Sequence, residues 1–422
     1  MAQMKTTIVD WVHHFRKEGE VVLLESQKKD HPESKISYLA ARPKRIIKSY
    51  GANIHIQDKH KEEVQINDND PWTALKAFRN QQSWLFGYYG YDLKNYLEDL
   101  KSENSEFYSA PDMFFMEPEV LIQFEDGKLP VFILGDEMQE APEEPVFSPF
   151  YLKEKNKISK QDYCQRIEQA KSEIAEGEYY EINLSHAIAY DFKGDPLALY
   201  TEMNKVGEVP FAAFCSFKDL SVCCQSPERF IRKKGNRIWS QPIKGTISAD
   251  GDDASESERK LNTEKNRAEN LMIVDLVRND LNRIAKPGSV EVSKLFEIQH
   301  FSTVHQMVST IECEIRDEID EIEVIKSCFP MGSMTGAPKI SAMRAIEKLE
   351  DHKRGIYSGA IGYFDPKGDF DFNVVIRTAV IQGNTLTYAV GGAITSDSDP
   401  EEEWEETLWK SQALRKTVNN SG

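Results

Sequence analysis

The sequence predicts a protein that mixes β-strands with helices and can build a large folded unit. Three observations support this prediction: a β-rich first third, a well-capped amphipathic helix beginning near Ser159, and a run of strands and tight turns over 357–395. The 422 residues are enough for one large domain or two to three ordinary ones. Because 40% of the residues are hydrophobic, the chain can bury a sizeable core.

The overall charge limits the partners that we expect. A formal net charge of −18 disfavours nucleic acid and anionic membranes as partners. The sequence also contains no apolar run of about 18 residues, the length that a membrane-spanning helix needs. An anionic small substrate could still bind if local cations or a metal ion offset the negative field.

Cysteine usage favours a reducing compartment. None of the cysteines forms a C-x-x-C pair, so no zinc or redox motif is predicted. The first residues show no signal-peptide pattern. We therefore expect a cytoplasmic protein with buried free thiols at Cys164, Cys215, Cys223, Cys224, Cys313 and Cys328.

A change in composition near residue 150 marks the main boundary that the sequence predicts, between regions 1–150 and 151–422. Residues 136–149 are acidic and contain several prolines, which is typical of a connector. The first region holds a buried-strand candidate at 21–24 and an aromatic run at 84–91. The glycines of this run suit a core strand that another backbone approaches closely.

The second region begins with a helix and a strand. Ser159 is a suitable N-cap, Gly177 a suitable stop, and residues 180–185 alternate as in a half-buried strand. A turn at 233–236 then predicts a hairpin, which would bring Glu228 alongside Lys244.

Lys244 is the first candidate for chemistry, in the hexapeptide 241–246, where it precedes Gly245. A lysine in a dry pocket can lose its proton and act as a nucleophile, although most lysines are solvated surface charges. Glu228 is likewise either a site carboxylate or the surface ion-pair partner of Arg229 or Lys233.

Three later residues have two interpretations each. Glu269 borders an apolar helical segment, so it either needs a cation or metal or lies at a solvated edge. His305, in an apolar strand, is either a satisfied core residue or a site residue. Arg377 has apolar neighbours and needs an anion, from the protein or from a substrate.

Two helix starts could also contribute to a site. A glycine-rich loop at 329–339 leads into a helix whose free backbone N–H groups could bind a carboxylate. Asp399 caps a final helix on which Glu403, Glu406 and Lys410 share a face. This face is either a solvated acidic surface or a magnesium carboxylate with a neighbouring cation.

Several long motifs resemble the chorismate-utilising enzymes, over roughly 160–415 and more weakly before. Within this family, anthranilate synthase large subunits carry P-I-A-G-T, whereas aminodeoxychorismate synthase component I carries P-I-K-G-T, as residues 242–246 do. The motifs that carry the resemblance lie at 180–184, 226–230, 272–280, 331–339, 357–363 and 391–407.

The resemblance implies an α+β fold of two large antiparallel β-sheets, packed orthogonally as a sandwich with helices on the outside. It implies conversion of chorismate and ammonia to 4-amino-4-deoxychorismate, in 4-aminobenzoate and folate biosynthesis. The ammonia would come from a separate glutamine amidotransferase subunit. The alternatives are anthranilate synthase component I, which Lys244 disfavours, and a catalytically silent partner subunit.

The resemblance also implies roles for individual residues. Lys244 would attack C2 of chorismate, Glu228 would protonate the departing C4 hydroxyl, and His305 would lie near that hydroxyl. Glu269 and Glu406 would bind Mg²⁺, and the cations around the substrate would disfavour a proton on Lys244. The implied substrate-binding residues are Thr335, Tyr357, Arg377, Gly391, Gly392 and Lys410.

Two places raise questions of their own. Glu181 stands where related synthases often have glutamine and the isochorismate-forming branch has lysine, so it would add an unpaired carboxylate near the ammonia entry side. Leu24, Glu25 and Ser26 resemble the motif that binds feedback tryptophan in anthranilate synthases, and form either a structural site, a regulatory site or a plain strand.

Overall fold

The structure is a computed structural model that describes residues 7–27, 35–59, 61–66, 70–79, 82–138, 142–248, 254–300 and 304–419. Its strands are β1 Val21–Glu25, β2 Ile36–Tyr50, β3 Asn53–Asp58, β4 Lys61–Ile66, β5 Leu85–Tyr89, β6 Met113–Glu125, β7 Val131–Leu134, β8 Tyr151–Lys157, β9 Glu181–Lys193, β10 Phe211–Phe217, β11 Leu220–Ser226, β12 Arg229–Lys234, β13 Arg237–Gln241, β14 Ile243–Ser248, β15 Glu291–His300, β16 Val304–Glu314, β17 Gly336–Ala337, β18 Ala360–Phe364, β19 Phe370–Asn373, β20 Thr378–Gln382 and β21 Thr385–Ile394. Its helices are α1 Ile8–Phe15, α2 Pro71–Phe78, α3 Lys160–Ala175, α4 Pro196–Val206, α5 Ala254–Leu261, α6 Glu264–Asn282, α7 Glu321–Cys328, α8 Lys339–Leu349, α9 Pro400–Lys410 and α10 Gln412–Asn419, with short 3₁₀ helices η1 Tyr91–Tyr96 and η2 Gly332–Met334.

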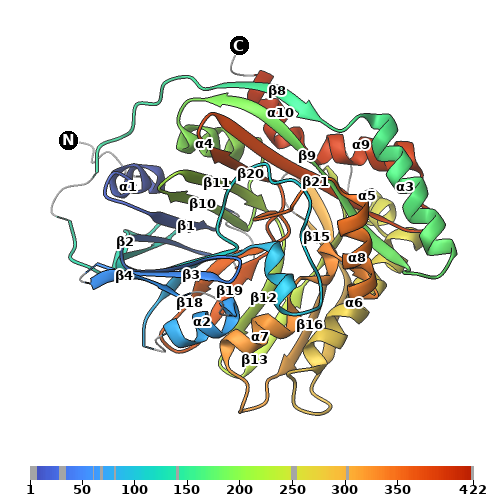
Figure 1. The fold of residues 1–422 in the computed structure, drawn as a ribbon, viewed down its shortest axis with the longest axis horizontal. Coiled ribbons are helices and arrows are strands. Elements are labelled where there is room, and N and C mark those ends of the chain that lie inside the picture. Colours follow the sequence, from blue (N-terminus) through green and yellow to red (C-terminus); the bar gives the residue numbers. More distant parts are fainter. Residues whose placement is uncertain are drawn as a thin grey trace.

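The predicted α+β class is confirmed, with the strands at the centre and helices around them (Figure 1). The longest pairings, β2 with β6, β9 with β21 and β15 with β16, are antiparallel. The pairings join all the strands into one continuous network, so the expected division into two distinct sheets is not seen in the strand pairing.

Strands from both halves of the chain alternate in this network. β1 pairs with β2 on one side and with β10 on the other, and β5 pairs with β18. The close backbone approach predicted for the run at 84–91 is confirmed at Gly87, where a Cβ would lie 1.9 Å from the Phe114 carbonyl oxygen. Residues 1–150 therefore help to build the sheet that carries the rest of the chain.

Local sequence explains the helix that the pattern predicts most clearly. Ser159 caps α3 by accepting a hydrogen bond from the Asp162 backbone N–H, and Gly177 follows the helix with φ +84°. The apolar stripe that includes Tyr163 and Ile167 packs against Trp404 of α9. This packing holds α9 in place.

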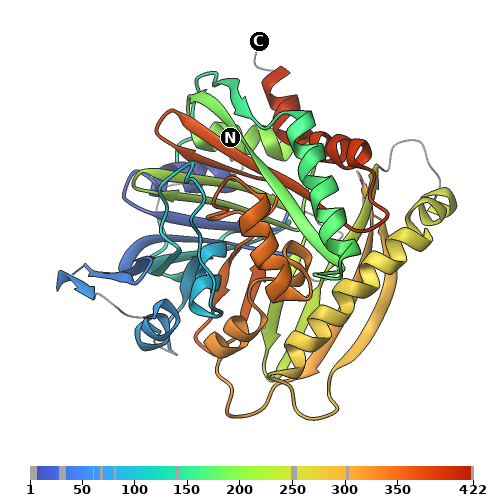
Figure 2. The ribbon, with the colours of Figure 1, turned by 45° about the vertical axis from the view of Figure 1, so that its right-hand side comes forward.

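The helices that position the site lie on one side of the strand network (Figure 2). α9 packs on β21, while α6 packs on β14 and β16. Residues of β9, β14, β21, α6 and α9 line a cavity between these layers. Among the described residues, no helix is long and apolar enough to cross a membrane.

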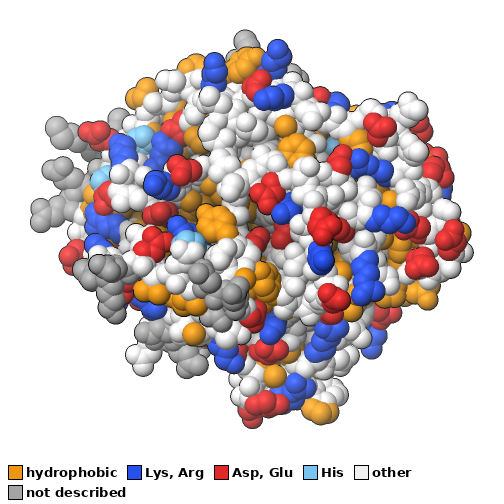
Figure 3. Space-filling view, in the orientation of Figure 1, with side chains coloured by type: hydrophobic (Ala, Val, Ile, Leu, Met, Phe, Trp, Pro, Cys, Tyr) orange, Lys and Arg blue, Asp and Glu red, His pale blue; other side chains and the backbone are white. Residues whose placement is uncertain are grey.

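The prediction of buried free thiols is confirmed for five of the six cysteines. All six cysteines are free and five are buried, as predicted, but Cys164 is only partly buried because it lies on the outer part of α3. Acidic and basic side chains are interspersed over the face of the molecule seen in Figure 3.

Candidate active site

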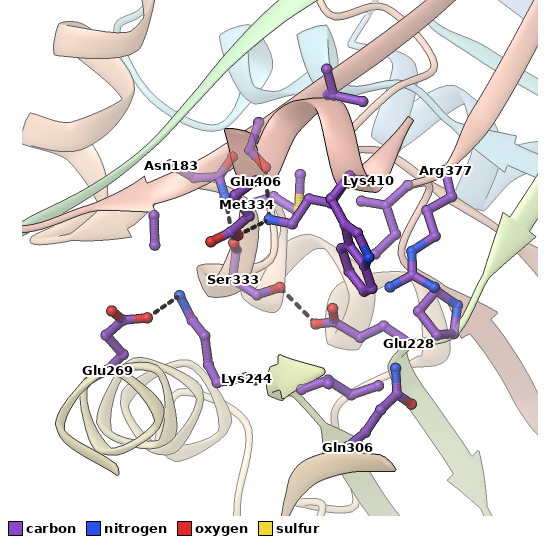
Figure 4. A pocket seen from close by; sticks show the side chains of 18 of the residues that line it. Asn183, Glu228, Lys244, Glu269, Gln306, Ser333, Met334, Arg377, Glu406 and Lys410 are labelled. Atoms are coloured by element: carbon purple, nitrogen blue, oxygen red, sulfur yellow. Dashed lines mark hydrogen bonds and ion pairs between the residues drawn. The ribbon is translucent and has the colours of Figure 1, made fainter. Parts of the chain in front are cut away.

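A cavity of about 340 Å³ lies between these layers and gathers most of the predicted site residues (Figure 4). Its walls come from distant parts of the chain, from β9 through α9. The predicted residues that line it are Glu228, Lys244, Glu269, Tyr357, Arg377, Gly391, Glu406 and Lys410.

A β-bulge aims Lys244 into the cavity. In the pairing of β14 with β16, Lys244 lies opposite Met307 and Thr246 opposite Gln306, so Gly245 is the extra residue. Gly245 has φ +76°, a conformation that glycine adopts without strain. Lys244 and Gly245 consequently both line the cavity instead of facing opposite sides of the strand.

The amine of Lys244 is held by carboxylates. Its Nζ lies 2.9 Å from Glu181 Oε1 and 3.8 Å from Glu269 Oε2. Burial lowers the pKa of Lys244, but the attraction of Glu181, Glu269 and Glu406 outweighs burial and raises this pKa above its ordinary value. The expectation of an unpaired Glu181 is therefore wrong, and the protein alone favours the protonated amine rather than the neutral one.

Glu228 is suited to proton transfer near neutral pH. The predicted hairpin of β12 and β13 is confirmed, and Glu228 lies just before it, where its Oε1 accepts a hydrogen bond of 2.7 Å from Ser333 Oγ. Burial raises the pKa of Glu228 to about 7, although the Ser333 hydrogen bond and nearby cations oppose the shift. Arg229 pairs with Asp371 instead, which excludes the alternative of a Glu228–Arg229 surface pair.

Arg377 presents a guanidinium group to the cavity (Figure 4). Among the described residues, no carboxylate forms an ion pair with Arg377, although Glu228 attracts it from farther away. Burial lowers the pKa of Arg377, with Tyr388 and Glu228 opposing the shift. Tyr357 lines the same cavity, and together they form a place for an anionic group.

The two predicted metal ligands line the cavity from different helices, Glu269 from α6 and Glu406 from α9. Lys410 Nζ lies 2.6 Å from Glu406 Oε1 and donates to the Gly391 carbonyl oxygen at 2.8 Å. Burial raises the pKa of Glu269. Burial acts in the same direction on Glu406, but Lys410 outweighs it and lowers that pKa.

This donor set fits Mg²⁺ bound together with a substrate. Mg²⁺ prefers oxygen ligands and is usually held by one or two carboxylates, with water and substrate oxygens completing its coordination. In the described part of the chain, no three His, Cys, Asp or Glu side chains are close enough to hold an ion alone. Glu269 and Glu406 would thus need oxygen atoms of a ligand to complete the site.

Three predicted residues lie outside the cavity lining. His305 is buried but does not line the cavity, whereas its neighbour Gln306 does, because successive residues of a strand face opposite sides. Thr335 is fully buried and its hydroxyl bonds to the carbonyl oxygens of Met331 and Gly332. Gly392 faces α9, where a Cβ would lie 3.1 Å from Glu403 Oε2.

The structure adds residues that the sequence did not single out. Asn183, two residues after Glu181 on β9, lines the cavity, as does Ser333 of the glycine-rich loop. Glu403 of α9, which the sequence placed on one face with Glu406 and Lys410, lines it too. The alternation at 180–185 places Asn183 on the same strand face as Glu181, so the sequence pattern could have predicted its position. The hydrogen bond of Ser333 to Glu228 had no sequence signal, because the two residues are far apart in the chain.

Leu24, Glu25 and Ser26 line a second, separate cavity of about 450 Å³. The carboxylate of Glu25 accepts hydrogen bonds from the Tyr200 hydroxyl and from Asn204 Nδ2. This motif therefore lies beside a cavity, and whether it binds a ligand stays a prediction.

Comparison with known proteins gives the context for this geometry. The chain is 42% identical over 295 residues to aminodeoxychorismate synthase of Streptomyces griseus. The aligned region covers 68% of this chain but only 40% of that protein. It is 31% identical over 414 residues to aminodeoxychorismate synthase component 1 of Klebsiella aerogenes, with 92% of this chain and 91% of that protein covered. It is 32% identical over 364 residues to anthranilate synthase component 1 of Aquifex aeolicus, with 79% of this chain and 74% of that protein covered.

Structural similarity agrees with these matches. The crystal structure of anthranilate synthase component I from Streptococcus pneumoniae superposes with a TM-score of 0.78 at 26% identity, covering 91% of this chain and 93% of that one. The profile of the family described as chorismate binding enzyme matches residues 19–416. The cavity, the fold and this match lead to one conclusion: the chain belongs to the family of chorismate-binding enzymes.

Proposed function

We propose that the protein is an aminodeoxychorismate synthase, which converts chorismate and ammonia to 4-amino-4-deoxychorismate through a covalent adduct of Lys244. The observation that carries this proposal is the position of the Lys244 amine, inside a cavity that also holds Glu228 and Arg377. An alanine at position 244 could not form such an adduct.

The substrate carries two carboxylates, and the cavity offers separate places for them. Arg377 and Tyr357 bind the carboxylate of the enolpyruvyl group at one end. At the other end, Glu269 and Glu406 would hold Mg²⁺, which would supply positive charge for the ring carboxylate and for polarisation of the ring. Lys410 adds a cation next to Glu406.

Two displacements then replace one difficult step. The neutral amine of Lys244 forms a bond to C2 while the C4–O bond breaks, and Glu228 gives its proton to the departing hydroxyl, so water leaves. Ammonia next forms a bond to C4 while the bond between C2 and the Lys244 nitrogen breaks. The new amine carries the positive charge, and its proton restores Glu228.

Lys244 must lose its proton before the first step. In the protein alone, Glu181 and Glu269 hold the amine as an ammonium ion, so release of the proton has to accompany binding of substrate and metal. A cation between Glu269 and Glu406 would weaken the hold of both carboxylates on the amine.

The ammonia source belongs to the same proposal. Relatives named component 1 support a second component, which we propose to be a glutamine amidotransferase subunit. This chain spans 40% of the longer Streptomyces griseus relative, so an additional domain there could serve that purpose.

The experiment that tests the proposed function identifies the product. The protein is incubated with chorismate, Mg²⁺ and ammonium chloride, and the products are separated and identified by mass spectrometry. We expect aminodeoxychorismate, which yields 4-aminobenzoate only after a lyase is added. Fluorescent anthranilate would support the alternative that the Aquifex aeolicus relative suggests, and no product at all would support a silent subunit.

A further inference from the structure

Arg354 is a buried cation that the sequence did not single out. It lies between α8 and β18 and pairs with Glu350, whose Oε1 accepts a hydrogen bond from Nη2 at 2.6 Å and whose Oε2 accepts one from Nε at 3.0 Å. Each of the two side chains is 1% exposed. Burying two charges costs free energy, and apolar residues of similar volume often stabilise a protein equally well. Stability alone therefore does not explain this pair.

The other N–H groups of Arg354 bind three separate segments. Nη1 donates to the Met334 carbonyl oxygen at 2.6 Å and to Ser358 Oγ at 3.2 Å. Nη2 also donates to the Asn183 carbonyl oxygen at 2.7 Å. With the bonds to Glu350, every N–H group of the guanidinium has an acceptor. Arg354 thus joins β9, the glycine-rich loop and the segment that follows α8.

All three of these segments contribute to the wall of the active-site cavity. Asn183, Met334 and Tyr357 line it, and the Tyr357 backbone N–H donates to the Arg354 carbonyl oxygen at 3.0 Å. Met334 directly follows Ser333, whose Oγ donates to Glu228 (Figure 4). The guanidinium therefore fixes the loop that carries the hydrogen-bond donor of Glu228.

We propose that Arg354 is a positioning residue, which holds Ser333 against Glu228 and so sets the strength of that acid. The inference rests on the proposed function, in which Glu228 protonates the departing hydroxyl, and it concerns a side chain that does not line the cavity. A planar guanidinium can direct two carbonyl groups at once, whereas the ammonium group of a lysine is a point charge.

The test removes the fork without leaving a charge buried alone. A paired variant combines Arg354→Met with Glu350→Met, which keeps the net charge and replaces both partners by apolar side chains. Arg354→Lys keeps the charge but loses the fork. The matched control combines Arg79→Met with Glu321→Met, a second buried pair that lies outside the cavity lining, with side chains 3% and 10% exposed.

The measurement is the rate of chorismate consumption as a function of pH, at saturating chorismate, Mg²⁺ and ammonia. Because the acid form of Glu228 donates the proton, kcat should fall as pH rises through its pKa of about 7. Burial raises this pKa, and the hydrogen bond from Ser333 lowers it, as do the charges of Lys244, Arg377 and Lys410. None of these three cations is changed in the variants.

We expect the paired variant and Arg354→Lys to lower kcat about tenfold or more, because small displacements of positioned groups cost large factors in rate. The fall of kcat should also move to higher pH, since the hydrogen bond that favours the Glu228 carboxylate is weakened. When Ser333→Ala is already present, the paired change should shift this pH no further. The control pair should keep the kcat and the pH profile of the wild type.

Two results would overturn the inference. An unchanged pH profile in the paired variant and in Arg354→Lys would show that Arg354 is a structural residue only, and Arg354→Lys alone decides this if the paired variant does not fold. An equal shift in the control pair would assign the effect to lost stability. A product other than aminodeoxychorismate would refute the proposed function instead, while the pH profile of chorismate consumption would still decide the role of Arg354.

Discussion

Lys244 and Glu181 form a buried ion pair, with Nζ 2.9 Å from Oε1. The side chain of Glu181 is 2% exposed and that of Lys244 11% exposed, so water screens the pair poorly. The residue that we propose as nucleophile is thus also a structural partner, and changing it should affect both catalysis and stability.

The first prediction concerns Lys244→Met. Removing one partner of a buried pair leaves an uncompensated charge, here on Glu181, so we expect the unfolding free energy to fall by about 3 kcal/mol. Turnover should fall by ~1,000-fold or more, because among the described residues only Lys244 pairs with both Glu181 and Glu269. Urea unfolding and intact-protein mass spectrometry measure the two effects.

A double variant and a surface variant control this experiment. Adding Glu181→Gln to Lys244→Met should recover stability without recovering activity. Lys260→Met, on α5 and outside the cavity lining, should leave both properties near those of the wild type. Full activity of Lys244→Met would remove this residue from the mechanism.

The second prediction concerns pH and Glu228. At saturating chorismate and Mg²⁺, when Lys244 has already released its proton, kcat should fall as pH rises above about 7, because the pKa of Glu228 is raised to about 7 and its acid form donates the proton. Glu228→Gln should be slow and lack this limb. Ser333→Ala should move the limb to higher pH, since the lost hydrogen bond stabilises the carboxylate.

The raised pKa of Glu228 also makes the stability of the folded protein depend on pH. The neutral form is favoured in the folded protein, so its stabilisation is complete below the unfolded pKa near 4.5 and is lost as pH rises through about 7. Glu228→Gln should therefore be more stable than the wild type at pH 8, by up to about 3 kcal/mol, but not at pH 4. Equal stability differences at both values would contradict the assignment.

The third prediction contrasts two arginines. Among the described residues, no carboxylate forms an ion pair with Arg377, so Arg377→Met should raise the melting temperature while raising KM for chorismate by about 100-fold. Arg229 is buried and pairs with Asp371 at 2.9 Å, so Arg229→Met should lower the melting temperature. Calorimetry and steady-state kinetics distinguish the two. Destabilisation by both changes would show that Arg377 has a structural anion.

The fourth prediction concerns the metal. Glu269→Gln and Glu406→Gln should each weaken Mg²⁺ binding in the presence of chorismate by about tenfold or more, because each removes one charged ligand. Titration calorimetry without ammonia measures this directly, apart from turnover. Glu402→Gln, exposed on α9, is the matched control and should bind Mg²⁺ as the wild type does. Unchanged binding in both cavity variants would place the metal elsewhere.

Local features were the most predictable part of the fold. The N-cap at Ser159, the hairpin after Glu228 and the close approach at Gly87 all depend on a few neighbouring residues, and all are confirmed. Strand pairing between distant segments, such as β1 with β10, depends on long-range register that no local pattern contains. This is why the expected pair of sheets and the observed single network differ.

In the site, strand register decides which of two neighbouring residues lines the cavity. His305 and Gln306 are neighbours in β16, and a shift of one residue moves a side chain to the other face. The sequence could not predict the pairing of Lys244 with Glu181 either, because the bulge at Gly245 turns the lysine toward β9. Sequence motifs supplied the candidate residues, and three-dimensional register decided their contacts.

The wall that α9 contributes has a consequence for how the protein matures. Glu406 and Lys410 are synthesised after every other cavity residue discussed above, so a ribosome makes the strands of the sheet before this wall exists. Until α9 docks on β21, Lys244, Glu181 and Glu269 of a nascent chain would be exposed to water. The proposed active site would therefore be completed late in biosynthesis, and a polypeptide that ends before α9 should lack the proposed activity.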